Sequence, residues 1–242
     1  MVIKKKKDNK NVNENVNIEI PEDAEVIELD QEALEALMGG CSPVAQSFNY
    51  TWLDSFDMED LDERRLYINY EIDESLIDEI GYHIMRYNRL DKGKEVKERT
   101  PIIIYINTFG GSLHAANTII SMINSSKTPV YTVNLGLALS AGFLIFIAGH
   151  KRYSLESGIF MLHDGQNMYY NSLGKIFNAV FFDKEVIEKK IKEYVLEKTS
   201  ITSKLYDKKY HQDWYMDTQK ASELGVCDYI VGENCTLDDI LN

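Results

Sequence analysis

Two kinds of hydrophobic pattern alternate along the chain after about residue 61. Runs rich in apolar and β-branched residues, typical of strands within a sheet, occupy 65–70, 101–106, 130–135, 158–162 and 226–231. Between these runs, apolar residues recur at helical spacing, most clearly over 73–88, 113–123 and 172–198. This alternation predicts an α/β domain whose strands are joined by parallel connections.

Residues 130–149 are the stretch around which this pattern is organised. The stretch begins as a β-branched run, passes Gly136 and continues as apolar sequence that only Ser140 interrupts. It predicts a strand that passes into a buried helix, and it is too short for the ~20 apolar residues of a membrane span. A serine there is either a packed hydroxyl bonded to a helical carbonyl or a nucleophile at a helix start, and the stretch alone favours the packed hydroxyl.

The first sixty residues differ in composition from the rest. No Lys or Arg occurs from Asn11 to Asp60, while acidic residues recur throughout that segment. We expect 1–60 to be an acidic, partly disordered extension with a short helix near 30–38, which either packs on its own domain or docks on a partner. The folded domain is predicted over 61–233, and 234–242 is predicted as a C-terminal tail.

Charge and cysteine content exclude several classes of protein. The net charge of −13 argues against nucleic acid or an anionic membrane as a partner. The three cysteines form neither a disulfide framework nor a zinc-type spacing. The basic start of the chain is followed by no apolar segment, so it does not predict a secretory signal, and we expect a cytoplasmic protein.

Candidate chemistry lies at strand ends and helix starts. Gly110 and Gly111 separate the strand 101–106 from a helix, His163 ends the strand 158–162, and Asp213 lies in a loop that leads into a helix. Nucleophilic catalysis needs a base, a group that orients the base, and N–H donors for an oxyanion. With all these parts available, the interpretation of Ser140 changes from packed hydroxyl to nucleophile.

Five sequence blocks, taken in order, resemble the proteolytic subunit of Clp protease (ClpP), a family of serine peptidases. The blocks are Ile104–Ser112, Gly136–Gly142, Phe160–His163, Asp213–Thr218 and Glu223–Asp228. The resemblance implies a crotonase-like ββα spiral fold in which the helix 172–198 is the handle by which rings interlock. It also implies that Tyr169 and Tyr170 lie near a strand that clamps an extended substrate.

The resemblance implies a role for each candidate residue. Ser140 would be the nucleophile, His163 the general base and Asp213 the orienting acid. Gly111 and Ala141, with Gly110 beside them, would form the oxyanion and substrate-binding site. The implied protein is a serine endopeptidase that acts on polypeptides in a homo-oligomeric ring, heptameric or stacked in pairs, without metal, nucleotide or other cofactor. An AAA+ unfoldase partner is left open.

The chain also departs from the family pattern. Thr108-Phe109 replaces Ser-Pro before the glycine pair, which makes the substrate side bulkier, and Asp164-Gly165 replaces Gln-Pro after His163. Asp164 places an extra carboxylate beside His163, expected to move the activity profile to higher pH. His114 and His211 are predicted as surface or satisfied polar groups, although both lie near the candidate site in sequence.

Three alternatives remain beside this prediction. One is a catalytically silent ring subunit that acts as a scaffold, and another is a phage-type protease that processes capsid proteins without an ATPase. The third is a crotonase-type acyl-CoA enzyme, which would not require Ser140, His163 and Asp213 together and is disfavoured by their presence.

Overall fold

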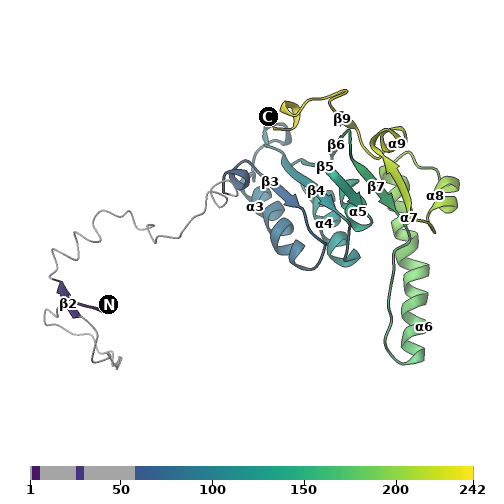
Figure 1. Ribbon diagram of the computed structural model, residues 1–242, viewed down its shortest axis with the longest axis horizontal. Helices are drawn as coiled ribbons and strands as arrows, with labels where there is room; N and C mark the ends of the chain where they lie inside the picture. The colour runs from purple at the N-terminus through teal and green to yellow at the C-terminus, as the bar shows by residue number, and fades with distance from the viewer. Residues whose placement is uncertain (1, 6–25, 30–57, 242) are drawn as a thin grey trace. The chain divides into compact units, whose positions relative to one another are not determined.

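The computed structural model describes residues 2–5, 26–29 and 58–241 (Figure 1). The chain divides into two units, Met1–Ser55 and Phe56–Asn242. In the first unit, β1 (Val2–Lys5) and β2 (Val26–Leu29) pair in parallel. The helix predicted over 30–38 lies outside the described residues.

The second unit is built on a seven-stranded sheet. Five parallel neighbours follow one another in the order β3 (Arg65–Ile68), β4 (Ile102–Thr108), β5 (Val130–Leu139), β6 (Lys151–Leu155) and β9 (Tyr229–Val231). The strand β7 (Ile159–Leu162) also pairs in parallel with β5. The predicted α/β architecture is therefore confirmed, and it agrees with the ββα fold that the resemblance to the ClpP family implies (Figure 1).

The long strand β5 pairs along one edge with two strands in succession, first β6 and then β7. Tyr131–Asn134 pair with β6, and Leu137–Leu139 pair with β7. The chain changes partner near Gly136, so the end of β5 and the end of β7 lie next to each other. These two ends carry Ser140 and His163.

The sequence prediction is wrong about the segment after Asp213. Instead of a loop leading directly into a helix, residues Trp214–Asp217 form β8, which pairs antiparallel with β7. Trp214 and Met216 are buried, while Tyr215 is exposed. This alternation has the period of a strand, but four residues are too short to separate it from a loop in the sequence.

Helices cover the sheet and fix the ends of its strands. They are η1 (Ile77–Gly81), α3 (Tyr82–Leu90), η2 (Val96–Glu98), α4 (Leu113–Ser125), α5 (Ala141–Phe146), α8 (Ser203–Lys209) and α9 (Thr218–Glu223). Ile102, Ile104 and Ile106 of β4 pack in the main core with helices α4 and α5. Ile103 and Tyr105 point to the other face, where Ile240 of α10 (Asp238–Leu241) is buried in a smaller cluster. The segment predicted as a tail thus ends in a helix packed on the domain.

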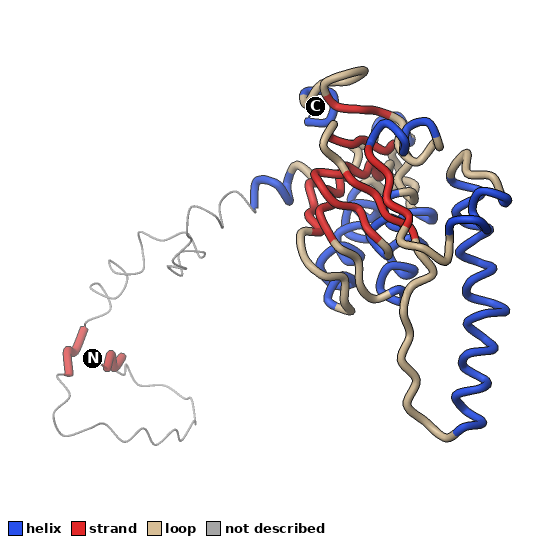
Figure 2. The backbone as a smooth tube through the Cα atoms, turned by 45° about the vertical axis from the view of Figure 1, so that its right-hand side comes forward, coloured by secondary structure: helices blue, strands red, loops and turns tan. Residues whose placement is uncertain are grey.

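The long helix expected over 172–198 is present. It consists of α6 (Leu173–Phe182), η3 (Asp183–Ile187) and α7 (Glu188–Lys198), which follow one another without interruption. Figure 2 shows this helix beside the extended segment that leads to it from β7. Asn167 and Tyr169 of that segment each donate a hydrogen bond to Asp183, which holds the segment against the helix.

Candidate active site

Ser140 lies in the tight turn between β5 and α5. Its backbone has φ +53° and ψ −118°, a conformation that a residue other than glycine adopts at a cost of roughly 1–3 kcal/mol. The turn is held because the Ser140 N–H donates to the Met161 carbonyl at 2.9 Å and the Leu144 N–H donates to the Ser140 carbonyl at 3.3 Å. The buried apolar helix that follows therefore fixes the direction of the Ser140 side chain.

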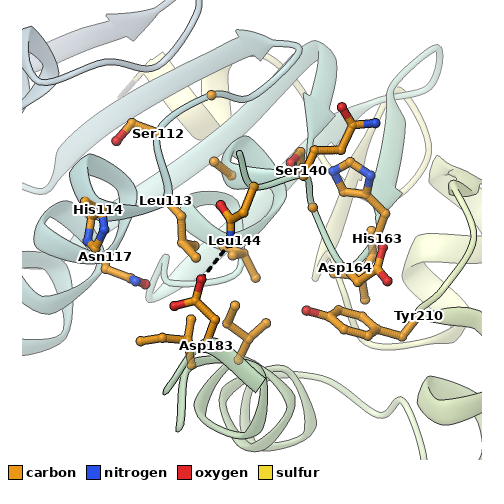
Figure 3. A pocket seen from close by; sticks show the side chains of 18 of the residues that line it. Ser112, Leu113, His114, Asn117, Ser140, Leu144, His163, Asp164, Asp183 and Tyr210 are labelled. Atoms are coloured by element: carbon orange, nitrogen blue, oxygen red, sulfur yellow. Dashed lines mark hydrogen bonds between the residues drawn. The ribbon is translucent and has the colours of Figure 1, made fainter. Parts of the chain in front are cut away.

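The side chain of Ser140 contacts His163 and not a helical carbonyl. Ser140 Oγ lies 2.8 Å from His163 Nε2, and His163 Nδ1 lies 3.1 Å from Asp213 Oδ1. The antiparallel pairing of Leu162 with Trp214 places His163 and Asp213 opposite each other, one residue beyond the ladder. The three side chains form a continuous relay from hydroxyl to imidazole to carboxylate, of which Figure 3 shows the first two members facing each other.

The glycine pair lies on the other side of Ser140. Ile72 bridges across the pair, since its N–H donates to the Gly110 carbonyl at 2.7 Å and its carbonyl accepts from the Ser112 N–H at 2.6 Å. In such a parallel bridge, the backbone N–H and carbonyl of the residue between the two bonded ones, here Gly111, point away from the opposing strand. The Gly111 N–H is therefore directed away from Ile72.

Both glycines are required by close packing. Gly110 and Gly111 have φ +105° and +142°. A Cβ on Gly111 would lie 2.1 Å from the Ile72 carbonyl oxygen, and a Cβ on Gly110 would lie 2.8 Å from Ser140 Cβ. Ala141 is the first residue of α5, so its N–H has no acceptor within the helix. The N–H groups of Gly111 and Ala141 thus flank Ser140 and are available to an oxygen atom.

A pocket of about 580 Å³ opens over Ser140 and His163 (Figure 3). The long helix forms one wall with Asp183, Ile187 and Ile191. Carboxylates of Glu71, Asp164 and Asp183 line this pocket, and none of the described residues that line it is Lys or Arg. The periodicity of the long helix predicted an apolar stripe that includes Ile187 and Ile191, but it gave no signal that the stripe faces the site.

Other residues singled out in the sequence take varied places. His114 lines the pocket, Phe109 is exposed beside the glycine pair, and Tyr170 is exposed. Tyr169 is held by Asp183. Asp164 accepts a hydrogen bond in the pair that it forms with His211 Nδ1 at 2.7 Å, so its carboxylate is directed to His211. The effect of Asp164 on the pH dependence of activity stays a prediction.

Two further properties concern the described residues as a whole. Within 2–5, 26–29 and 58–241, no group of three or more His, Cys, Asp or Glu side chains is arranged to hold a metal ion. In that same part of the chain, no helix has the length and apolar character needed to cross a membrane.

Comparison with known proteins gives a consistent result. The model of the Clp protease family matches residues 50–234. The ATP-dependent Clp protease proteolytic subunit 2 of Treponema pallidum is 24% identical, over 73% of this chain and 86% of that protein. The ATP-dependent Clp protease proteolytic subunit of Physcomitrium patens is 24% identical, over 76% of this chain and 90% of that protein.

Solved structures agree with these sequence relatives. A ClpP1 point mutant from Listeria monocytogenes superimposes with a TM-score of 0.62 and 25% identity, covering 77% of this chain and 99% of that one. The family model spans most of the chain, including every residue of the relay. The chain belongs to the Clp protease family, whose members are peptidases.

Proposed function

We propose that this protein is a serine endopeptidase whose catalytic residues are Ser140, His163 and Asp213. The observation that carries the proposal is the relay in which Ser140 Oγ lies 2.8 Å from His163 Nε2 and His163 Nδ1 lies 3.1 Å from Asp213 Oδ1. Both distances are within hydrogen-bond reach of a nucleophile, its base and the group that orients the base. Membership of a peptidase family makes a peptide bond the substrate that this relay would cleave.

The mechanism follows from the atoms at these positions. Ser140 Oγ attacks the scissile carbonyl while His163 Nε2 takes its proton, and Asp213 keeps the imidazole in the required tautomer. The N–H groups of Gly111 and Ala141 stabilise the negative charge on the carbonyl oxygen. His163 then gives its proton to the leaving amine. Water, activated by the same imidazole, hydrolyses the acyl-enzyme and releases Ser140.

The proposal is tested by removing the base. In His163→Ala the hydroxyl of Ser140 has no group to accept its proton, so kcat for an internally quenched fluorogenic peptide should fall by about 10³-fold or more. His150→Ala is the matched control, because His150 contacts Val130 far from the pocket and should leave kcat within about twofold. A His163→Ala enzyme that retains most of its kcat would rule out the proposed relay.

The glycine pair gives a second test of the same site. Gly111→Ala places a methyl group 2.1 Å from the Ile72 carbonyl oxygen, in a conformation with φ +142°. The bridge to Ile72 must open, which should turn the Gly111 N–H away from the oxyanion and lower kcat by about 10²-fold or more. Steady-state kinetics with the same peptide measures this loss. Gly93→Ala is the matched control, because Gly93 also has a positive φ, +93°, but its Cβ would meet nothing within 4 Å, and this variant should have normal kinetics.

We extend the proposal to self-assembly into a ring. The relatives named above are subunits by name, and α6 exposes a set of large apolar side chains that one chain alone leaves in water. These are Leu173, Phe177, Val180, Phe181 and Phe182. Exposed apolar area of this kind is typical of a surface that another protein covers. A second copy of the chain, joined through α6, is the partner that the family relationship favours.

The assembly proposal predicts the behaviour of a double variant. Phe177→Glu with Phe181→Glu removes two stacked rings from the exposed face and adds charge there. The molar mass in solution, measured by light scattering after size exclusion, should fall from that of an oligomer to a smaller species. Lys175→Glu also adds negative charge to α6 but removes no apolar ring, and it should assemble normally. An unchanged mass in the double variant would exclude α6 as the contact.

The proposed partner for folded substrates is a separate AAA+ ATPase. The relatives are named as subunits of ATP-dependent proteases. The Gly-Gly turn of this chain is not a P-loop, because it lacks the Lys that binds the phosphates of ATP. On this proposal the chain hydrolyses short peptides by itself and requires the ATPase and ATP to degrade a folded protein. Degradation of folded protein by the isolated chain would favour an enzyme that acts without an ATPase.

A further inference from the structure

Two His–Asp pairs lie beyond the last paired residues of the β7–β8 ladder. The ladder ends where Leu162 opposes Trp214. His163, the residue after Leu162, contacts Asp213, the residue before Trp214, at 3.1 Å. Asp164, the residue after His163, contacts His211 at 2.7 Å, so this second pair passes over Gln212 and is one residue out of the ladder register. Each of the two segments thus supplies one histidine and one aspartate.

The carboxylate of Asp213 is weakly held for a group that must orient a base. Its side chain is 63% exposed. Within the described residues it has one hydrogen-bond partner, His163 Nδ1. An exposed pair of this kind is stabilised little by itself, because water and salt screen the charges and both side chains lose rotational freedom. The position of Asp213 therefore depends on the backbone that carries it.

That backbone is fixed at its ends, and in its middle by one turn hydrogen bond, from the Gln212 N–H to the Lys209 carbonyl at 3.0 Å. Tyr210 is buried and stacks on Tyr206, and Trp214 is buried at the start of β8. The three residues between them are exposed. The contact from His211 to Asp164 ties this exposed stretch to the segment after β7, where the chain turns at Gly165 with φ +74°. The same contact thus spans the two segments that carry Asp213 and His163.

We infer that Asp164 and His211 act as positioning residues for the relay, by joining the segments on which His163 and Asp213 stand. This inference rests on the proposed function, and neither residue is placed in contact with the reacting atoms. The pair limits how far the two segments separate, so Asp213 stays within reach of His163 Nδ1 for a larger fraction of time. Because the pair is exposed, its loss should lower the fraction of molecules in which Asp213 is within reach of His163 Nδ1 by about two- to fivefold.

Kinetics of charge-removing and exchanged variants test the pair. In Asp164→Asn and in His211→Gln, kcat should fall about two- to fivefold, while the melting temperature stays close to wild type. KM should also stay close to wild type in His211→Gln, because His211 does not line the pocket. Asp164→His combined with His211→Asp restores an attractive pair between the same segments and should recover most of the lost kcat. Lys220→Gln breaks an exposed pair with Glu223 of equal length on α9, and it should leave kcat unchanged.

A second measurement is independent of activity. Hydrogen exchange of the amides over 209–213 should become about two- to fivefold faster in Asp164→Asn than in wild type, with no change elsewhere in α8. Unchanged hydrogen exchange together with unchanged kcat in Asp164→Asn would overturn the inference. It would also be overturned if both single variants lowered kcat and the double variant with Asp164→His and His211→Asp recovered none of the loss. If the wild-type chain hydrolyses no peptide, the proposed function fails, and the exchange rates alone then decide whether the pair joins the two segments.

Discussion

Ser140→Ala is expected to lower kcat for peptide hydrolysis by about 10⁴-fold or more, because no acyl-enzyme forms without the hydroxyl. The fold should persist. The Ser140 Oγ contacts His163 within the site, while the backbone of the turn keeps its hydrogen bonds to Met161 and Leu144. Kinetics with an internally quenched peptide and a thermal melt of the same sample measure both effects.

A matched serine separates this effect from the loss of any hydroxyl. Ser121 is exposed on α4, donates to the backbone carbonyl of Asn117 at 2.8 Å and is not among the residues that line the pocket. Ser121→Ala should therefore keep kcat within about twofold of wild type. A Ser140→Ala protein that retained more than about one hundredth of the wild-type kcat would argue against covalent catalysis at this residue.

Asp91→Ala is expected to produce the largest loss of stability, about 3–5 kcal/mol in the free energy of unfolding, since it leaves a buried cation without its partner. The Asp91 side chain is fully buried and accepts hydrogen bonds from Arg64 at 2.5 and 2.9 Å and from Thr128 at 3.0 Å. Arg64 directly precedes β3, so this pair joins the first strand of the domain to the end of α3. Urea denaturation of the variant measures the loss.

The partner Lys94 supplies the control for this substitution. Lys94 also contacts Asp91, at 3.0 Å, but its side chain is 49% exposed. Lys94→Gln should therefore cost about 0–1 kcal/mol, the range of an exposed ion pair. A loss below about 1 kcal/mol in Asp91→Ala would show that Arg64 finds water or another acceptor when Asp91 is removed.

The same pair makes stability depend on pH in a defined direction. The hydrogen bonds from Arg64 hold the pKa of the Asp91 carboxyl well below its ordinary value of 3.8. A carboxyl whose pKa is lowered by folding stabilises the folded state above its unfolded pKa, and that contribution is lost as the pH falls below it. The difference in unfolding free energy between wild type and Asp91→Asn should thus be constant near neutral pH and shrink below about pH 4.

Much of the fold follows from the hydrophobic pattern. The isoleucines of β4 are buried on both faces of the sheet, as a continuous apolar run in a parallel strand requires. The run after Val130 predicted both β5 and the buried helix that begins at Ala141. These elements are set by local sequence and burial together, so the pattern identifies them.

The parts that escaped prediction depend on tertiary contacts. The four residues of β8 become a strand because β7 offers them an unpaired edge, which no local pattern reveals. The pairing of Asp164 with His211 has the same origin, since the two residues meet only because β7 and β8 run side by side.

The candidate residues of the site were predictable for a different reason. Ser140, His163 and the glycine pair each stand where a buried strand ends, and the ends of neighbouring parallel strands lie at one edge of a sheet. The exposure of Asp213 and the contribution of Asp183 to the pocket were not predictable, because both depend on how the loop after α8 and the long helix pack.

The central claim is that Ser140 is an activated nucleophile, and labelling by a fluorophosphonate tests it most directly. Such a probe reacts with a serine whose hydroxyl transfers its proton to a neighbouring base, and intact mass and peptide mapping locate the product. We predict that the assembled wild-type protein gains one label per chain on the peptide that contains Ser140, and that His163→Ala gains none. Wild-type protein that stays unlabelled, or a label on any other residue, would contradict the account.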